Sequence, residues 1–236
     1  MQHEIHKGKT WDIVYDAALT AKPGVEYFNV GYWRSRRALS GEAVGRGSAY
    51  FVEADIGPVV LRHYLRGGWA AKLSRQHYIF TGASRSRPFR EYHLLAQLYA
   101  RGLPVPRPVA ALCRHSGIVS TGAIVTVRIA DTQTLADMMT GEGPGEGAWT
   151  GIGKCIRRFH DAGVWHADLN ARNILLDGES RVFLIDFDRA RFRPGVAVKG
   201  EGNLKRLKRS LVKFWPADEI HALQLAWTEF ESAYRE

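Results

Sequence analysis

The chain has 236 residues, of which 45% are hydrophobic and 24% are charged, so it is long enough to bury a core in one domain or in two small lobes. Its 33 lysine and arginine residues outnumber its 24 acidic residues, and the net charge of +9 favours nucleic acid, acidic lipid or a phosphorylated or carboxylated substrate over a cationic partner. The sequence lacks the run of roughly 18 apolar residues that a membrane span requires and any long apolar run near its start, so we expect no secretory signal and only peripheral contact with a membrane.

The first predicted strands lie in the N-terminal half, next to a glycine-rich stretch. Two apolar runs, at residues 50–52 and 59–62, flank the dipeptide Gly57-Pro58, which predicts a β-hairpin with its turn at that dipeptide. Before the hairpin, Gly45 and Gly47 form a G-R-G sequence that fits a loop covering phosphate groups, because glycine lets backbone N–H groups approach phosphate oxygens. A plain hairpin turn explains the same two glycines, so both interpretations stay open.

Residues 62–90 form a basic segment that contains no Asp or Glu. Apolar residues then recur at helical spacing from Tyr92 to Tyr99 and predict a helix over residues 89–101. Gly102 ends this helix, and the prolines that follow forbid its resumption. The basic residues of the segment are Arg62, Arg66, Lys72, Arg75, Arg85, Arg87 and Arg90.

The C-terminal half alternates short strands and helices. Residues 122–129, β-branched and uncharged up to Arg128, predict a buried strand. Residues 130–132 are the expected hinge between an N-terminal lobe of residues 1–131 and a C-terminal lobe of residues 132–236. The remaining predicted elements are helices over residues 134–139 and 148–161, strands over residues 164–165, 174–176 and 182–185, and a helical region from Asn203 onward.

The strongest chemical signal is the sequence H-A-D-L-N-A-R-N, which runs from His166 to Asn173. An Asp followed five residues later by an Asn on a tight loop places two oxygen-bearing side chains at one site, where Asp168 can accept a hydroxyl proton and Asn173 can ligate Mg²⁺. A predicted strand then ends at Asp186, a carboxylate that suits a hard cation. A capped loop and a solvent-facing strand end are the plainer explanation, but they leave the order and spacing of these residues unexplained.

This succession of H-x-D-L-x-x-x-N, a short hairpin and D-F-D resembles the protein-kinase-like superfamily. The resemblance implies an α+β, two-lobed fold with a small antiparallel-sheet N-terminal lobe and a reduced, mostly helical C-terminal lobe. It implies ATP and Mg²⁺ as cofactors, Asp168 as the catalytic base or hydroxyl-orienting group, and Asn173 and Asp186 as metal ligands. His166 and Asp188 would support the site, His166 by orienting the loop through hydrogen bonds rather than by reacting itself.

Residues 59–62 match the V-A-I-K sequence of protein kinases in frame but end in Arg62 instead of lysine. Arginine also pairs with phosphate or carboxylate, and it does so through two parallel hydrogen bonds. Glu91 on the following predicted helix is the expected partner, so Arg62, Glu91, Gly45 and Gly47 form the predicted nucleotide-binding group. Arg62 is also explained as one more member of the basic segment.

Departures from protein kinases indicate a small acceptor rather than a protein. The chain has no A-P-E sequence after Asp186, and the 50 residues that follow are too few for a peptide-binding lobe. Residues 186–215 carry nine basic and three acidic residues, and leucines recur at helical spacing from Leu204, which predicts a basic amphipathic helix. Its apolar face would pack on the lobe, and its cations would either be solvated or also lie near an anionic membrane.

The two basic segments favour an anionic acceptor. Positive charge on both sides of the site repels the polycationic acceptors of aminoglycoside kinases, which share the same catalytic pattern. An anionic sugar or lipid is therefore expected. The candidate acceptor contacts are Arg66, Lys72, Arg75 and Arg87.

Further stretches resemble one branch of this superfamily, the lipopolysaccharide kinases, and within it the 3-deoxy-D-manno-octulosonic acid (Kdo) kinases. The resemblance covers about residues 40–215 and includes G-R-G at residues 45–47, S-R-P-F-R-E at residues 86–91 and the catalytic loop. It implies transfer of phosphate from ATP to the 4-hydroxyl of Kdo on a lipid A precursor, at the cytoplasmic face of a bacterial inner membrane and without a nucleic-acid partner. A core heptose kinase stays open as an alternative, as does a catalytically inactive kinase-like module that binds anionic lipid or nucleic acid.

Overall fold

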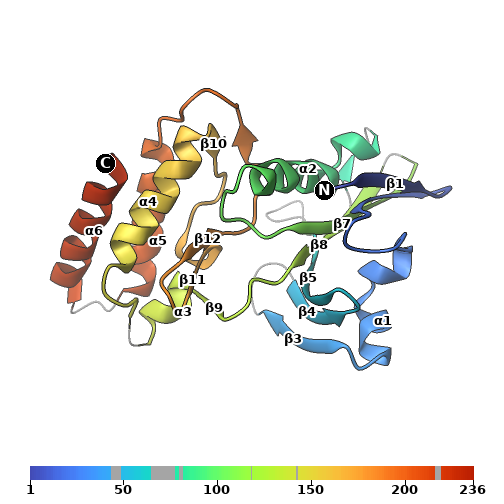
Figure 1. Cartoon of the computed structure of the whole chain (residues 1–236), viewed down its shortest axis with the longest axis horizontal. Helices are drawn as coiled ribbons and strands as arrows, with labels where there is room; N and C mark the ends of the chain where they lie inside the picture. The colour runs from blue at the N-terminus through green and yellow to red at the C-terminus, as the bar shows by residue number, and fades with distance from the viewer. Residues whose placement is uncertain (44–48, 65–77, 80–81, 118, 142, 216–218) are drawn as a thin grey trace. The chain divides into compact units, whose positions relative to one another are not determined.

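The computed structural model describes residues 1–43, 49–64, 78–79, 82–117, 119–141, 143–215 and 219–236 (Figure 1). The chain divides into two compact units, one made of Met1–Ala100 and Pro106–Arg128 and the other of Arg101–Val105 and Ile129–Glu236. Antiparallel sheets and packed helices both occur along the chain, which confirms the expected α+β class.

The first unit is built on one antiparallel sheet. Alternating apolar residues on its strands bury one face, and this face holds the core. Figure 1 shows the strands of this sheet in blue and green. The strand order is β1 (His3–Lys7), β2 (Trp11–Asp16), β7 (Pro108–Ser116), β8 (Val119–Val127), β5 (Gly57–His63), β4 (Ala49–Ala54) and β3 (Leu39–Ala43), and β6 (Tyr78–Ile79) also pairs with β8. Core residues include Ile13, Tyr15, Phe28, Trp33, Val52, Val59, Leu61, Leu112 and Val125.

The predicted hairpin is confirmed as β4 and β5, but its turn was placed wrongly. The turn consists of Asp55 and Ile56, which directly precede the expected dipeptide Gly57-Pro58. Gly57 already pairs with Ala54, and its φ of 99° is a conformation that glycine adopts without steric cost. The glycine therefore closes the turn instead of forming its centre.

Helix α2 (Arg87–Ala100) packs against strands β7 and β8 of the same sheet. Its apolar face buries Phe89, Tyr92 and Leu95, as the helical spacing predicts. Tyr99 was expected on this face, but it is 41% exposed, and the guanidinium of Arg107 lies 5.7 Å from its ring. The shorter helical elements of this unit are η1 (Val25–Phe28), α1 (Val30–Ser35) and η3 (Ala83–Arg85).

The second unit combines two small sheets with four helices among its described residues. Strand β11 (Ile174–Asp177) pairs with β12 (Val182–Leu184) and β9 (Thr132–Thr134), and β10 (Val164–Trp165) pairs with β13 (Arg191–Phe192). The helices are α3 (Leu135–Met139), α4 (Ala148–Asp161), α5 (Glu201–Phe214) and α6 (Ile220–Arg235), with a short turn, η4 (Ala171–Asn173), before β11. None of the described helices is long and apolar enough to cross a bilayer.

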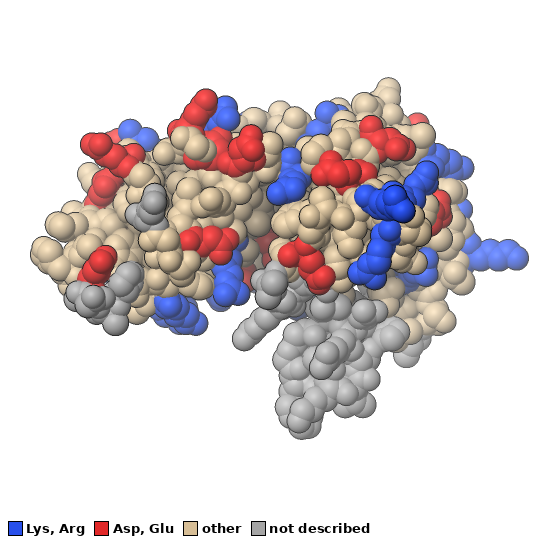
Figure 2. Space-filling view, turned by 90° about the horizontal axis from the view of Figure 1, so that it is seen from below, with Lys and Arg blue, Asp and Glu red and all other residues tan. Residues whose placement is uncertain are grey.

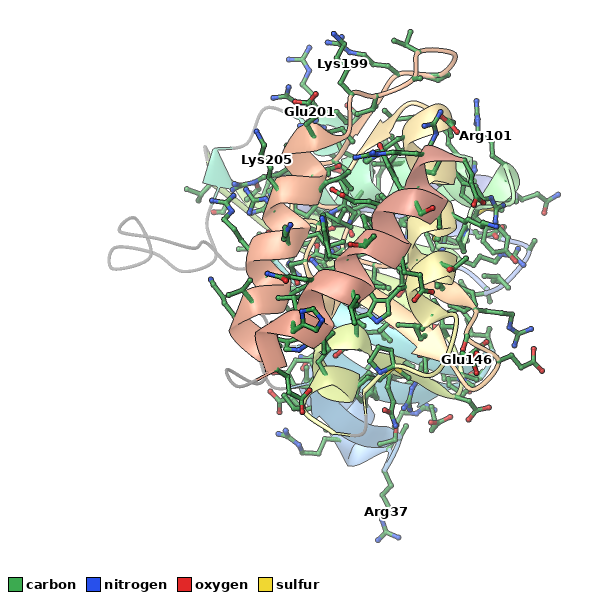
Figure 3. All side chains as sticks on the ribbon, turned by 90° about the vertical axis from the view of Figure 1, so that its left-hand side faces the viewer. Arg37, Arg101, Glu146, Lys199, Glu201 and Lys205 are labelled. Carbon is green, nitrogen blue, oxygen red and sulfur yellow. The ribbon has the colours of Figure 1, made fainter. Side chains whose placement is uncertain are left out.

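Helix α5 is the basic amphipathic helix that the leucine spacing predicts. Leu207 and Leu211 are fully buried, so the apolar face packs on its own unit. The basic residues lie on the exposed side, and Figure 3 shows Lys205 projecting from the helix near Glu201. Basic and acidic side chains of the described residues are interspersed on the face of the molecule seen in Figure 2.

Candidate active site

The predicted catalytic loop, residues 166–173, follows strand β10 and is held by its buried first residue, His166. The backbone N–H of His166 donates to Oδ1 of Asn203 at 3.2 Å, and its carbonyl accepts from Nδ2 of Asn203 at 2.6 Å. Asn203 lies on α5 and is 0% exposed, so one buried amide satisfies both backbone groups of His166. The loop therefore leaves the strand in a direction set by helix α5.

The imidazole of His166 ties the loop to the segment that carries Asp186. Its Nδ1 accepts a hydrogen bond from the backbone N–H of Asp168 at 3.2 Å, and its Nε2 donates to the carbonyl of Ile185 at 3.0 Å. One ring nitrogen accepts and the other donates, which is the pattern of a neutral ring. Burial lowers the pKa of His166, although hydrogen bonding to Ile185 and the charges of Asp186 and Asp168 oppose that effect. Both carboxylates therefore lie close enough to act on the ring electrostatically.

Asp168 combines a fixed backbone with an accessible carboxylate. Its carbonyl accepts from Nδ2 of Asn173 at 2.9 Å and from Nδ2 of Asn170 at 2.9 Å. Its side chain is 57% exposed, and Oδ1 accepts a hydrogen bond from Nη1 of Arg206 at 3.0 Å. A carboxylate held in this way can receive a hydroxyl proton from a ligand in solution.

Asn173 and Asp186 are brought together by the pairing of β11 with β12. Ile174 lies opposite Leu184, and the backbone N–H of Ile185 donates to the carbonyl of Asn173 at 3.1 Å. Asp186 follows at once with a φ of 63°, which turns the chain sharply at the strand end. Because Nδ2 of Asn173 is committed to Asp168, its Oδ1 is the atom left to act as a ligand.

These donors fit a magnesium ion better than a metal held by protein alone. Among the described residues, no group of three His, Cys, Asp or Glu side chains could hold a metal ion. Mg²⁺ commonly uses one or two protein oxygens and completes its coordination with water and phosphate oxygens. Asn173 and Asp186 supply one amide oxygen and one carboxylate, which matches that requirement.

Phe187 anchors the D-F-D sequence in the core. It is 1% exposed, its ring stacks on Phe159 with centroids 5.7 Å apart, and the ring centroid of His166 lies 4.8 Å from its own in an edge-to-face arrangement. Asp188 is half-buried and begins the turn that follows Phe187. The buried ring thus fixes the backbone on both sides of it.

In the first unit, Arg62 and Glu91 form the expected pair. Nη2 of Arg62 lies 2.6 Å from both carboxylate oxygens of Glu91, and the hydroxyl of Tyr64 also donates to this carboxylate. The Glu91 side chain is 3% exposed and that of Arg62 is 22% exposed, so the charge of Glu91 is compensated inside the unit. Arg87 lies with this group, its guanidinium 5.3 Å from the ring of Tyr64.

Five predicted site residues lie outside the described part of the chain. They are the two glycines of the expected phosphate-covering loop and three of the four candidate acceptor contacts. Their predictions therefore stay predictions. The residues are Gly45, Gly47, Arg66, Lys72 and Arg75.

The sequence did not indicate that helix α5 contacts the catalytic loop at three positions. Beyond the contacts of Asn203 with His166 and of Arg206 with Asp168, Oγ of Ser210 accepts from the backbone N–H of Ala171 at 3.0 Å. Positions 203, 206 and 210 lie three and four residues apart, on one side of the helix. The signal was two polar residues, Asn203 and Ser210, on a face otherwise made of leucine.

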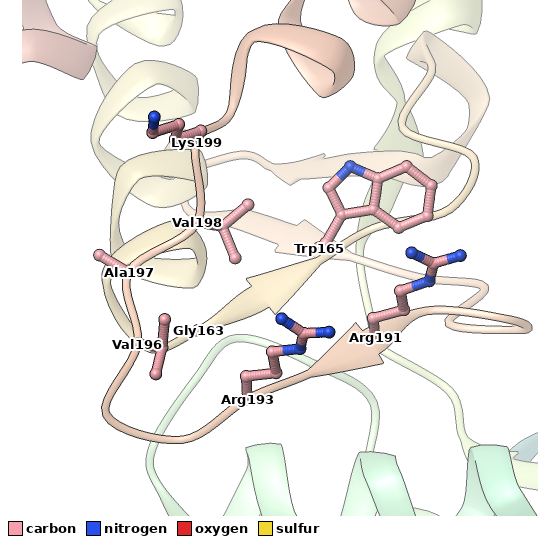
Figure 4. A pocket seen from close by; sticks show the side chains of 8 residues that line it. All are labelled: Gly163, Trp165, Arg191, Arg193, Val196, Ala197, Val198 and Lys199. Atoms are coloured by element: carbon pink, nitrogen blue, oxygen red, sulfur yellow. The ribbon is translucent and has the colours of Figure 1, made fainter.

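A pocket of about 270 Å³ lies beside β10 and β13 (Figure 4). Trp165 lines it, with the guanidinium of Arg191 5.4 Å from the indole ring, and Arg193 and Lys199 add two further cations. The segment between these two residues is held by a hydrogen bond of 2.9 Å from the N–H of Val198 to the carbonyl of His160. An aromatic face with several cations suits an anionic sugar.

Comparison with known proteins agrees with this geometry. The family model described as "Lipopolysaccharide kinase (Kdo/WaaP) family" matches residues 30–234. A 3-deoxy-D-manno-octulosonic acid kinase of Stenotrophomonas maltophilia is 42% identical over 222 residues, which cover 94% of this chain and 88% of the relative.

Relatives of the same name occur in other bacteria. The one from Xanthomonas euvesicatoria pv. vesicatoria is 44% identical over 85% of this chain and 80% of its own length. The one from Photobacterium profundum is 37% identical over 91% of each chain. The chain therefore belongs to the lipopolysaccharide kinase (Kdo/WaaP) family and is a phosphotransferase that acts on a hydroxyl group.

Proposed function

We propose that this protein transfers the γ-phosphoryl group of ATP to the 4-hydroxyl of Kdo on a lipid A precursor. The observation that carries the proposal is the hydrogen-bonded unit in which His166 and Asn173 connect Asp168 with the strand end at Asp186. Relatives named Kdo kinase support the choice of Kdo over heptose as acceptor. The intact set of base and metal ligands argues against a catalytically inactive binding module.

The proposed step is an in-line displacement at phosphorus. The acceptor hydroxyl attacks, the bond between the γ-phosphorus and the bridging oxygen breaks, ADP leaves, and the hydroxyl proton passes to the carboxylate of Asp168. Mg²⁺, when bound, would neutralise phosphate charge, with Asn173 and Asp186 as its protein ligands. The chain's own contribution is mostly positioning, since the Asp168 backbone is held by two asparagine side chains.

Arg62 is assigned to the nucleotide. Glu91 fixes the guanidinium through both carboxylate oxygens, and a guanidinium has enough N–H donors to bind a carboxylate and a phosphate together. Gly45 and Gly47, which lie outside the described residues, would cover the phosphates. Asp188 and His166 would support the metal-binding segment.

The acceptor is proposed to be an anionic glycolipid at the cytoplasmic face of the inner membrane. The net charge of +9 favours it, because Kdo has a carboxylate and lipid A has phosphates. Arg66, Lys72, Arg75 and Arg87 stay the candidate acceptor contacts. The exposed cations of α5 would draw the protein to an anionic membrane surface.

A direct assay tests the proposal. Purified protein is incubated with labelled ATP, Mg²⁺ and a Kdo-bearing lipid A precursor, and the phosphate is located by mass spectrometry and NMR. Asp168→Asn should lower kcat by about 10²–10⁴-fold, because positioned proton transfer contributes about that much, while the melting temperature stays unchanged.

The matched control is Asp161→Asn. Asp161 is also a half-exposed carboxylate paired with an arginine in the same unit, but it lies at the end of α4. This variant should retain wild-type kcat. Near-normal turnover in Asp168→Asn would contradict the role of Asp168 as proton acceptor. Phosphorylation of a heptose acceptor in place of Kdo would show that the substrate is a core heptose.

A further inference from the structure

Arg206 places a permanent positive charge directly on the proposed catalytic carboxylate. Its Nη1 lies 3.0 Å from Oδ1 of Asp168, and the two side chains are 45% and 57% exposed. A surface ion pair of this kind contributes little to folding, because water competes for both groups. The stability of the folded protein therefore does not require this cation to face this carboxylate.

The position of Arg206 is set by its helix rather than by the ion pair. One residue on either side of it along the helix face is buried against the catalytic loop: Asn203 holds both backbone groups of His166, and Ser210 accepts from Ala171. Leu207, the next residue after Arg206, is fully buried. The backbone of Arg206 is thus held next to the catalytic loop, and its guanidinium reaches Asp168 from there.

An anionic acceptor has to approach a carboxylate in order to react here. Its own negative charge and that of Asp168 repel each other, and the repulsion grows as water leaves the site. A guanidinium between the two removes this obstacle, because it can donate to two carboxylates at once. Arginine has five N–H donors, and the contact with Asp168 uses one of them.

We propose that Arg206 is the carboxylate-binding residue of the acceptor site, which bridges Asp168 and the carboxylate of the acceptor sugar. This inference rests on the proposed function. In Kdo, the carbon that bears the carboxylate and the carbon that bears the 4-hydroxyl are separated by one methylene of the same ring. A sugar that presents this hydroxyl to Asp168 therefore presents its carboxylate to a group next to Asp168, which is where Arg206 stands.

The other cations of α5 lack this placement. Lys208 lies over the ring of Trp227 at 5.0 Å, on the side of the helix that faces α6. Lys205, Arg209 and Lys213 are exposed, and the structure pairs none of these three described side chains with the catalytic loop. Arg206 alone among the basic residues of this helix is hydrogen-bonded to Asp168 in the described part of the chain.

The test compares two acceptors and three proteins. The acceptors are a deacylated, water-soluble Kdo–lipid A precursor and the same compound with its Kdo carboxylate converted to a methyl ester. The proteins are the wild type, Arg206→Gln and the control Arg157→Gln. Arg157 matches Arg206 well, since it also pairs with an aspartate and its side chain is 43% exposed.

Arg206→Gln should raise the KM for the free acid by at least about tenfold, because a hydrogen bond between charged groups is lost. Its KM for the methyl ester should equal that of the wild type, and the KM for ATP should not change. The wild type should prefer the free acid to the ester by a similar factor. Arg157→Gln should behave as the wild type with both acceptors.

Three outcomes overturn the inference, and a fourth overturns the proposed function on which it rests. An equal rise in KM for both acceptors in Arg206→Gln would show that Arg206 only orients Asp168. A full effect in Arg157→Gln would mean that general charge, not position, matters. Equal KM values of the wild type for the free acid and the ester would show that the carboxylate is not recognised. If the wild type phosphorylates neither acceptor, the proposed function itself fails.

Discussion

At the scale of single residues, the catalytic loop is held by a buried chain of polar side chains. The hydroxyl of Tyr234 on α6 lies 2.7 Å from Nδ1 of His160 on α4, and Nε2 of His160 lies 3.1 Å from Oδ1 of Asn203. Asn203 in turn holds both backbone groups of His166. Since Oδ1 of Asn203 can only accept, Nε2 of His160 donates to it. Burial lowers the pKa of His160 and so favours the neutral ring, in which Nδ1 accepts from the hydroxyl of Tyr234.

The neutral state of His160 predicts a pH-dependent stability. Burial lowers the pKa of His160 below its usual 6.5, with the hydrogen bond to Asn203 opposing the shift. Below pH 6.5 the unfolded chain binds a proton that the folded protein excludes, so the free energy of unfolding should fall as the pH drops from 6.5 toward the lowered pKa. Above pH 6.5 the residue is neutral in both states and contributes no slope.

Urea unfolding between about pH 5 and pH 8 checks this expectation. His160→Gln should be less stable at neutral pH but should show a shallower decline on acidification. The decline should not vanish, because burial also lowers the pKa of His166 and of His93. The same slope in wild type and variant would contradict the assignment of a neutral buried His160.

At the scale of elements, helix α5 is the support for the catalytic loop, and α4 and α6 support α5. Helices α4 and α6 approach closely at Gly153. A Cβ atom at this position would lie 2.6 Å from the carbonyl oxygen of Phe230 and 3.1 Å from the Cβ of Ala233. The glycine therefore permits a spacing between the two helices that any side chain would widen.

Two glycines of α4 make a matched pair for this argument. Gly153→Ala should lower the free energy of unfolding by about 2 kcal/mol, because backbone atoms of α6 cannot move aside freely. Gly151→Ala should raise it by about 0.5–1 kcal/mol through helix propensity. At Gly151 the nearest atoms to a new Cβ would lie 3.5 Å away, which is ordinary contact.

Thermal or urea unfolding of both variants measures the difference. Each change adds the same methyl group to the same helix, two residues apart. The comparison therefore isolates the helix–helix spacing from helix propensity. Equal effects of the two substitutions would show that α4 and α6 do not depend on close packing at Gly153.

At the scale of the whole molecule, the chain has a net charge of +9, and helix α5 carries five basic residues and one acidic residue. The side of this helix that carries Asn203 and Ser210 holds the catalytic loop, and Lys205, Arg209 and Lys213 are exposed to solvent. A helix of this kind can bind its unit and an anionic surface at the same time. This arrangement would bring the catalytic loop close to a membrane-anchored acceptor.

Sedimentation with lipid vesicles tests that proposal. The wild type should bind vesicles rich in anionic lipid and not neutral vesicles, and salt should weaken the binding by screening. The triple variant Lys205→Gln, Arg209→Gln and Lys213→Gln should lose about 3 kcal/mol of binding free energy, at about 1 kcal/mol per basic residue.

The control replaces three arginines at the C-terminal end of α1, Arg34, Arg36 and Arg37, with glutamine. It removes the same net charge from the first unit. Membrane binding equal to that of the wild type is expected, and so is normal turnover of a deacylated acceptor by both triple variants. Equal losses of vesicle binding in the two triple variants would show that overall charge, and not α5, governs association.

The prediction from sequence succeeded where the information is local. The spacing of apolar residues placed α2, α4 and α5 close to their observed bounds. Each of these helices buries one side, and the period of its apolar residues shows which side is buried. Strand β7 was not predicted, since its Ala- and Leu-containing sequence favours no strand by itself. Its pairing with β2 and β8 makes it a strand, and that pairing is tertiary.

The candidate site likewise combines residues placed by local sequence with residues placed by tertiary packing. The sequence by itself determined the interval from Asp168 to Asn173 and the strand end at Asp186, because a short loop and a hairpin leave few ways to place these oxygens. Only the tertiary structure decided that Asn203 and Arg206 adjoin them. These contacts span 37 and 38 residues of chain, so they depend on where α5 packs rather than on any local pattern.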